Sequence, residues 1–404
     1  MKILSLANVY PNPSEPGLGL FVRARLQQVA TRASVKVIAP IPLLDYSNPK
    51  GKLFRRRDFP LTRQDGSIEV FHPRWLFPPG GTPANVLGQF LRLLPLVRRI
   101  RETFPFDLID AHFGYPEGAT AALLGSFFRV PYTITLRGSE TAFAASPARR
   151  RVLQWAMRRA ARIIAVSSDL RDFAVEQGVP PQLAVTIPNG IDPAIFYPRG
   201  NHSTRTRRTI VSAGELIEAK GHHLVIEAAK TLLDRGHDLE VVIVGGTARG
   251  GPSYEHQLRE LASFLRVEER VRFLGFADRE TLANLLSAAD LFCLASSTEG
   301  WPNVVNEALA CGTPVVASAV GGVRAMLENP RYGITVPPGD LTALTEALDQ
   351  ALHISWDRVA ISNWGQSRTW ADVAAEVLSI QQSLVAPERV FTGQPSPYVH
   401  HVRY

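Results

Sequence analysis

Short apolar runs alternate along the chain with segments of helical periodicity. The runs are nearly continuous in Val, Ile and Leu, which is typical of parallel strands buried on both faces. Strands are predicted at 2–7, 35–40, 68–72, 107–112, 132–136, 162–167 and 184–188, and again at 209–215, 240–246, 271–276, 291–296, 314–318 and 334–337. Amphipathic segments such as FVRARLQQVATR and HHLVIEAAKTLLDRG lie between them. This repeated strand–helix–strand order predicts an α/β protein with two Rossmann-like, doubly wound parallel sheets.

The periodicity breaks once, over PAIFYPRGNHSTRTRR (193–208), which is polar and basic. We interpret this segment as a linker, because 404 residues exceed what a single core usually holds. The predicted organisation is a first domain over 1–192, a second over 209–364, a C-terminal helix over 365–385 and a tail over 386–404. Ligands of open parallel sheets bind beyond the carboxyl ends of the strands, so two such domains would face each other across a cleft.

Composition is that of a soluble globular protein, with 45% hydrophobic and 20% charged residues. No apolar run reaches 18 residues, and the start MKILSLANVY lacks the features of a signal peptide, so we expect a cytoplasmic protein. Cys293 and Cys311 both lie in apolar surroundings. They are too few for a disulfide framework or a zinc cluster and are predicted to be packing residues.

Charge is distributed unevenly between the two halves. Residues 1–190 contain 25 Lys and Arg against 13 Asp and Glu, whereas the remainder contains 19 against 24. The basic half therefore suits a polyanion, which could be nucleic acid, anionic lipid or a phosphorylated substrate.

The segment NVLGQFLRLLPLVRRIRE (85–102) adds a possible membrane contact. Apolar residues recur at helical spacing among arginines; they are Leu87, Phe90, Leu91, Leu94 and Val97, with Arg92, Arg98, Arg99 and Arg101 around them. One interpretation is a helix packed on the first sheet with its arginines in solvent. The other adds GKLFRRRDF (51–59) and PRWLFPPGG (73–81) and gives a basic, aromatic face for anionic headgroups on the inner side of the plasma membrane.

The stretch EGWPNVVNE places Glu299 and Glu307 eight positions apart around a predicted helix start. Pro302 and Asn303 mark that start, and the free amides at 303–305 would attract a phosphate. The two carboxylates could then accept hydroxyls on opposite sides of the phosphate, as a sugar–diphosphate–ribose would require. The alternative is a loop residue and a solvent-facing helix residue.

Other candidates follow predicted strands. Lys220 precedes a helix, where it is unfavourable unless an anion lies nearby, although solvation would also account for it. A glycine-rich loop follows the strand in VVIVGGTARGG, and Gly17, Gly19 and Leu20 lie in a second Pro/Gly-rich loop. His112 ends one strand, where it is either a satisfied structural residue or a functional group at the edge of the cleft. Arg137, Gly138 and Glu140 follow the next strand.

Together these strings resemble the retaining glycosyltransferases of family 4, which have the GT-B fold. The matching strings are GLGLFV, DAHFGYPEG, TLRGSE and IPNGIDPAIF in the first half and AKGHHLVIEA, VRFLGF, SSTEGWPNVVNEALACGTPVVAS and Gly321–Gly322 in the second. Within this family, the sequence most resembles bacterial transferases of the teichuronic-acid or exopolysaccharide type. The resemblance also implies that the last helix crosses back onto the first domain.

The resemblance implies roles for the candidates. Glu307 would hold the ribose, Lys220 the diphosphate, and Glu299 with the amides of Gly300 to Val304 the donor sugar and β-phosphate. His112 would lie near the reacting carbon. We expect Gly19 and Asn303 on the donor side, and Gly17, Arg137 and Glu140 on the acceptor side. One departure is Glu215, which stands where the family usually has arginine; a carboxylate about 4 Å from a phosphate charge would cost about 4 kcal/mol at an effective dielectric near 20.

The implied reaction transfers a sugar, with retention, from a UDP- or GDP-sugar to a hydroxyl of a glycan or lipid-linked acceptor in surface polysaccharide synthesis. The nucleotide sugar is a co-substrate, and no cofactor is expected. No Asp-x-Asp lies in a plausible metal loop, so we expect metal independence. Two alternatives stay open: a UDP-sugar epimerase of similar fold, and a non-enzymatic, basic nucleic-acid-binding protein. We do not expect nucleic acid, because the arginines are scattered and aromatic-basic signatures are missing.

Overall fold

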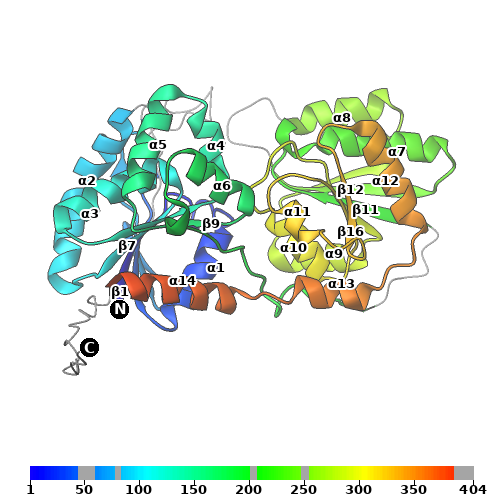
Figure 1. Cartoon of the computed structure of the whole chain (residues 1–404). Coiled ribbons are helices and arrows are strands. Elements are labelled where there is room, and N and C mark those ends of the chain that lie inside the picture. Colours follow the sequence, from blue (N-terminus) through cyan, green and yellow to red (C-terminus); the bar gives the residue numbers. More distant parts are fainter. Residues whose placement is uncertain (44–59, 78–82, 201–206, 247–253, 386–404) are drawn as a thin grey trace, which may run out of the picture.

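The protein consists of two α/β lobes lying side by side (Figure 1). The structure is a computed structural model that describes residues 1–43, 60–77, 83–200, 207–246 and 254–385. The strands of the first sheet, in spatial order, are β10 (Ala184–Thr186), β9 (Arg162–Ala165), β8 (Tyr132–Leu136), β7 (Leu108–His112), β1 (Lys2–Leu6), β2 (Ser34–Ile38), β5 (Ile68–Phe71) and β4 (Thr62–Asp65). Those of the second are β13 (Val271–Gly275), β12 (Leu239–Val244), β11 (Arg208–Ala213), β14 (Leu291–Leu294), β15 (Val315–Ser318) and β16 (Gly333–Val336).

Helices cover both faces of the first sheet. One core contains residues of α2 (Pro83–Thr103), α3 (Ala119–Phe128), α5 (Pro147–Arg159) and α6 (Ser168–Glu176), and the opposite one those of α1 (Leu20–Ala30) and α14 (Trp370–Val385). In β1, Leu4 and Leu6 enter the first core and Ile3 enters the second, and all three are fully buried. This alternation explains why the strands read as continuous apolar runs.

The second sheet is covered in the same way. Residues of α7 (His222–Asp234), α8 (Tyr254–Phe264) and α12 (Leu341–His353) share one core, and those of α9 (Arg279–Ala288), α10 (Asn303–Ala310), α11 (Val323–Met326) and α13 (Arg358–Gly365) share the other. Except for the antiparallel pair β4–β5, the strands of both large sheets pair in parallel. The predicted pair of doubly wound sheets is confirmed.

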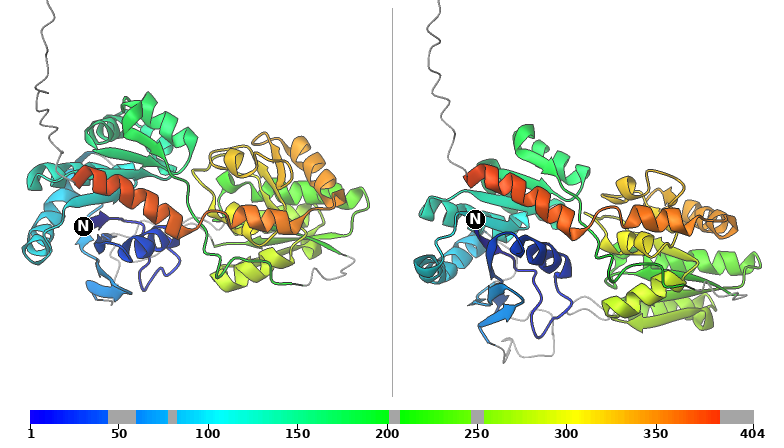
Figure 2. Two further views of the ribbon diagram at one scale, coloured as in Figure 1. Left: turned by 60° about the horizontal axis from the view of Figure 1, so that its bottom comes forward. Right: turned by 90° about the horizontal axis from the view of Figure 1, so that it is seen from below.

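The chain passes between the lobes twice, and the two passages lie together. Ile191 forms a parallel bridge with Thr369, with Ile191 N donating to Arg368 O at 3.0 Å and Trp370 N donating to Ile191 O at 3.2 Å. Beyond this point α14 runs along the first domain (Figure 2), where Trp370, Val373 and Val377 pack with Ile164 and Ile187. The predicted return of the last helix is therefore confirmed.

Every predicted strand is present, but other details differ from the sequence analysis. The edge strand β4 reads TRQD, and the small sheet β3 (Ile41–Pro42) with β6 (Arg74–Trp75) consists of two-residue strands, so neither carries an apolar run. Both cysteines are buried and free, as predicted. None of the described helices is long and apolar enough to cross a membrane.

Helix α2 forms where it was predicted, and Val97, Phe90 and Leu94 of its apolar residues pack against the first core, whereas Leu87 and Leu91 do not. Leu87 and Leu91 are 54% and 58% exposed, and Phe90 and Leu94 are only partly buried. The inward residues are Asn85, Val86, Gln89, Leu93, Val97 and Ile100. Leucines occur on several sides of this helix, so apolar spacing alone identified the side that packs only in part. The segment 51–59 and the residues 78–81 of PRWLFPPGG lie outside the described residues.

Candidate functional site

A cavity of about 630 Å³ lies between the domains and is lined by part of the predicted donor site. Gly19 lines it from the first domain, and Asn303 and Glu307 from α10 line it from the second. Gly17, which was predicted on the acceptor side, lines the same cavity. Gly19 has φ +67°, and a Cβ there would lie 2.3 Å from Val9 O, so only glycine fits. The loop entering α1 is thereby held against the cavity.

The start of α10 presents amides that no side chain caps. Pro302 is its N-cap residue and offers no side-chain acceptor. Val305 N donates to Pro302 O at 3.0 Å, so the amides of Asn303 and Val304 are the ones available to an anion, and the helix dipole favours negative charge there. One turn later, burial raises the pKa of Glu307 to about 7, and the charge of Arg279 opposes this shift.

Lys220 and Glu299 form an ion pair on the other side of that helix start. Lys220 Nζ lies 2.6 Å from Glu299 Oε1, which also accepts from Ser296 Oγ at 2.8 Å. The Lys220 side chain is 25% exposed and that of Glu299 8%. Glu299 is thus the anion that makes a lysine tolerable at the start of α7.

Backbone contact between two glycines closes the cleft beside this pair. A Cβ on Gly300 would lie 2.1 Å from Arg137 O, and a Cβ on Gly138 would lie 3.0 Å from Gly300 N. Next to them, a cavity of about 210 Å³ is lined by Gly138, Thr141, Glu299 and Gly321 among others. Glu299 and Glu307 therefore line two different cavities near the start of α10.

The first-domain wall of the cleft is a buried polar network. Asp110 on β7 pairs with Arg25 at 3.0 Å and accepts from Thr133 Oγ1 at 2.8 Å. His112 Nε2 lies 3.3 Å from Asp110 Oδ2, and His112 Nδ1 lies 3.0 Å from Arg137 Nη2. His112 is fully buried, and this burial lowers its pKa to about 3, so the imidazole is neutral.

Glu140, which was predicted on the acceptor side, does not face a ligand cavity but points into the protein. It is fully buried, and its oxygens accept from the amides of Gly114, Arg137 and Gly138 at 2.9, 3.1 and 2.8 Å. It therefore ties the loop after β7 to the loop after β8. Phe113, the residue after His112, has φ +77°, a conformation that is costly for a side-chain-bearing residue and that these loop contacts help to hold.

The structure brings most of the sequence-predicted site residues to one cleft. Gly17, Gly19, Asn303 and Glu307 share the large cavity, and Lys220, Glu299, Gly300 and Val304 surround the start of α10. Glu215 is exposed on the loop after β11, and Arg249, a candidate for compensating its charge, lies outside the described residues.

Two cleft residues were missed by the sequence analysis. Phe276 lines the large cavity and is 68% exposed, and Asn189 lies between Arg137 and Asn303. Phe276 could have been predicted from its place directly after a strand, where ligands of such sheets bind. Asn189 lies in IPNGIDPAIF, one of the strings that carry the family resemblance, but no role was predicted for it.

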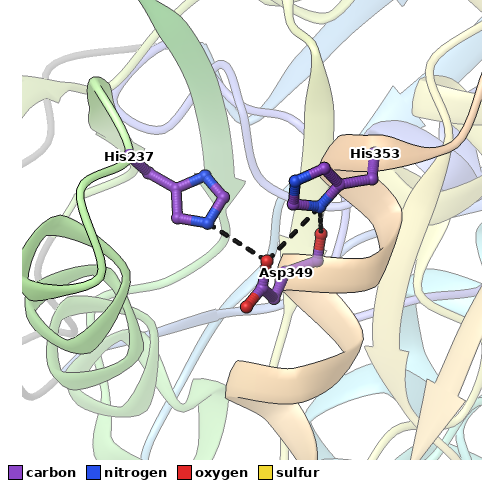
Figure 3. A group of neighbouring side chains, drawn as sticks. All are labelled: His237, Asp349 and His353. Carbon is purple, nitrogen blue, oxygen red and sulfur yellow. Dashed lines mark hydrogen bonds and ion pairs between the residues drawn. The ribbon is translucent and has the colours of Figure 1, made fainter.

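Within the described ranges, three side chains have the spacing of metal ligands, and they are not in the cleft. His237 Nε2 and His353 Nδ1 lie 3.1 and 3.4 Å from Asp349 Oδ1 (Figure 3). Asp349 also pairs with Arg235 at 2.8 Å, and the His353 side chain is 71% exposed. The carboxylate thus has ordinary surface partners without an ion.

Comparison with known proteins agrees with this geometry. Residues 48–195 match the family described as Glycosyltransferase Family 4, and residues 196–368 match Glycosyl transferases group 1. TuaC of Bacillus subtilis, named for teichuronic acid biosynthesis, is 29% identical over 373 residues, 87% of this chain and 90% of TuaC. WcaL of Escherichia coli K12, named for colanic acid biosynthesis, is 29% identical over 283 residues, 67% of each chain.

Solved structures share the fold at lower identity. Sucrose-phosphate synthase of Thermosynechococcus elongatus aligns with a TM-score of 0.78 and 19% identity over 96% of this chain and 99% of the other. HepE of Anabaena, solved with UDP and glucose, aligns with a TM-score of 0.73 and 21% identity over 95% of this chain and all of the other. With the two family matches running together from residue 48 to 368, the chain belongs to glycosyltransferase family 4 and is a glycosyltransferase with the GT-B fold.

Proposed function

We propose that this glycosyltransferase moves a sugar from a nucleotide-sugar donor to a hydroxyl of a glycan or lipid-linked acceptor in bacterial surface polysaccharide synthesis. The observation that carries the proposal is the arrangement at the start of α10, where uncapped amides lie near two cavities, one lined by Glu307 and the other by Glu299. A ligand with a central diphosphate and hydroxyl groups at both ends matches that arrangement. HepE, a structural neighbour, has been solved with UDP-glucose, and TuaC and WcaL are named for polysaccharide synthesis.

In the proposed binding mode the ribose lies at Glu307 and the donor sugar at Glu299, with the diphosphate over the amides of Asn303 and Val304. Lys220 would exchange part of its interaction with Glu299 for the diphosphate. As negative charge develops on the leaving group, the lysine and the helix amides stabilise it without a metal ion. The supporting observation is that Lys220 Nζ lies 2.6 Å from Glu299 Oε1, and Glu299 lines the smaller cavity.

Retention of anomeric configuration is part of the same proposal. In the conformation described, the His112 ring is neutral and both of its nitrogens face neighbouring polar groups, so it does not offer a free base. The departing phosphate itself would take the acceptor's proton while the new glycosidic bond forms on the face from which it leaves. The bond to the phosphate oxygen breaks, and the acceptor oxygen replaces it at the same carbon.

We further propose that the first domain approaches its acceptor on an anionic membrane surface at the cytoplasmic side. Leu87 and Leu91 project from α2 into solvent, one helical turn apart, and Arg92 and Arg99 are exposed on the same helix. Leu76 adds a further exposed apolar side chain in the preceding segment. Exposed leucines among arginines suit an interfacial contact with anionic headgroups.

A donor screen tests the proposed activity. UDP- and GDP-sugars are incubated with the protein with and without a lipid-linked sugar acceptor, with and without EDTA, and products are analysed by mass spectrometry and by NMR of the anomeric proton. We expect acceptor-dependent, EDTA-resistant transfer with retained configuration. Conversion of the donor to an epimer without acceptor would instead identify an epimerase, and absence of both reactions across the panel would contradict the proposal.

A further inference from the structure

A continuous line of polar side chains runs from the core of the first domain to the first residue of α10 in the second. It begins with Arg25, Asp110 and His112 and continues through Arg137. Arg137 Nη1 lies 3.2 Å from Asn189 Oδ1, and Asn189 Nδ2 lies 3.0 Å from Asn303 Oδ1. Asn189 is the residue that joins the two domains in this line, because Asn303 also lines the proposed donor cavity.

The direction of each hydrogen bond in this line follows from Arg137, since a guanidinium can only donate. His112 Nδ1 must therefore accept, which places the ring proton on Nε2, facing Asp110. The Asn189 atom that faces Arg137 must be its oxygen, so its amide nitrogen faces Asn303 and donates to it. An asparagine can serve both neighbours because it carries an acceptor and a donor on one planar group.

Asn189 also lies where the two passages between the domains meet. Gly190 follows it, and a Cβ on Gly190 would lie 2.4 Å from the carbonyl carbon of Thr369, so the passages are in backbone contact. Ile191 then bridges to Thr369. A rotation of one domain against the other about this point would change the distance between Asn189 and Asn303 while leaving Asn189 beside its own backbone neighbours.

We propose that Asn189 is a positioning residue that aligns the start of α10 with Arg137 when the two domains close. The proposal rests on the proposed function, because it assigns the aligned residues to the two sides of one transfer reaction. Group transfer requires the donor and acceptor to be held within a narrow range of distance and angle. The Asn189–Asn303 bond would supply that alignment only in the closed arrangement, in which Gly138 and Gly300 also touch.

This role predicts an effect on turnover rather than on nucleotide binding. The groups proposed to bind the nucleotide are Lys220, Glu307 and the amides of Asn303 and Val304, all in the second domain. Asn189 bonds only to the side-chain oxygen of Asn303 among them. Replacing Asn189 by Ala should therefore change the Kd of UDP or GDP by less than about twofold. It should lower kcat roughly 3- to 10-fold, the usual consequence of losing one hydrogen bond. Asn189→Asp should lose less than Asn189→Ala, because Asn303 can turn its amide and donate to the new carboxylate.

A double-mutant cycle separates this role from a merely structural one. The turnover of Asn189→Ala, Asn303→Ala and the double variant is measured, with calorimetric nucleotide binding to confirm that each variant is folded. Asn284→Ala serves as the matched control, because Asn284 Oδ1 accepts from Arg199 Nη1 at 2.8 Å at an exposed site. We expect the double variant to be no slower than Asn303→Ala alone, and the control to keep wild-type kcat.

Two outcomes would overturn the inference. If the effects on kcat multiply independently, the two asparagines do not act through their bond. If Asn189→Ala retains wild-type kcat while the wild type transfers sugar, Asn189 does not position the site. Failure of the wild type to turn over any nucleotide sugar would instead count against the proposed function, so the two failures can be distinguished.

Discussion

The two walls of the cleft carry their charges in different ways. On the first-domain wall, Asp110, His112 and Arg137 are at least nine-tenths buried and contact one another, with Arg25 bound beneath them. On the second-domain wall, Lys220 and Glu299 form a partly exposed pair, and burial holds the pKa of Glu307 near 7. The first wall keeps its shape because its charges are paired in the core. On the second wall, the partly exposed Lys220 can exchange partners with a ligand, and Glu307 lines an open cavity. Stability and ligand binding therefore depend on different walls.

The largest expected effect comes from breaking the first-domain wall. Asp110→Ala leaves the Arg25 guanidinium buried without its carboxylate, which should lower the free energy of unfolding by about 3–5 kcal/mol. Urea unfolding followed by circular dichroism measures the change. The control is Asp172→Ala, because Asp172 pairs with Arg171 at 3.2 Å with both side chains largely exposed, and its loss should cost less than about 1 kcal/mol. Equal losses in the two variants would contradict the assignment of stability to this wall.

Breaking the Lys220–Glu299 pair on the second-domain wall should change stability little and turnover strongly. Lys220→Ala should cost no more than about 2 kcal/mol in stability, because Ser296 still donates to Glu299 and the lysine is partly solvated. Its kcat should fall about 10²- to 10³-fold, since the lysine would act most strongly as the diphosphate leaves. Binding of UDP or GDP should weaken more than binding of UMP or GMP. Equal weakening of the monophosphate would show that Lys220 does not serve the second phosphate.

The raised pKa of Glu307 gives the second-domain wall a pH dependence. The ordinary value is 4.5 and the value in the fold is about 7, so between them the native state keeps a proton that the unfolded chain has lost. Stability without donor should therefore fall as the pH rises from 4.5 to about 7 and level off above it.

Donor binding should change in the other direction. The ionised carboxylate is the better acceptor for ribose hydroxyls, and its population rises about tenfold between pH 6 and pH 8 for a pKa near 7. Donor Kd measured across this range should fall by a similar factor in the wild type. Glu307→Gln should bind donor more weakly and without this trend. A wild-type donor Kd that does not change between pH 6 and pH 8 would show that ionisation of Glu307 does not contribute to donor binding.

The smallest expected effect concerns the outer surface of the first domain. Leu87→Ser combined with Leu91→Ser should leave unfolding almost unchanged, because both side chains are more than half exposed. It should reduce cosedimentation with phosphatidylglycerol-containing vesicles severalfold, and salt should reduce binding of the wild type. Leu274→Ser, at an exposed leucine of the second domain, is the matched control. If the wild-type protein does not sediment with these vesicles at low salt, the proposed membrane contact is contradicted.

The sequence was sufficient for the parts of the fold that repeat. Runs such as LIDAH and LFCL lie in strands buried on both faces, so every position is apolar or internally paired and the pattern is clear. The edge strand TRQD was missed because it faces solvent, and the packed face of α2 was predicted only in part because leucines lie around the helix.

The candidate site was predictable where the residues lie close together in sequence. Glu299, Asn303 and Glu307 belong to one strand–loop–helix unit, so their spacing already placed them around one helix start. The Lys220–Glu299 pair joins residues 79 positions apart, and the Asn189–Asn303 bond joins residues 114 apart. Such pairs depend on how the two walls meet, which no local pattern in one sequence specifies.

The central claim for this protein is that the nucleotide binds at Glu307 beside the start of α10. Calorimetric titration of UDP and GDP into wild-type protein, Glu307→Ala and Glu299→Ala tests this, with Glu328→Ala as a control at an exposed position of the same domain. We predict that either UDP or GDP binds the wild type and the control. Glu307→Ala should abolish this binding, whereas Glu299→Ala should still bind the nucleotide but transfer sugar slowly. Near-wild-type binding and turnover in both glutamate variants would contradict the account.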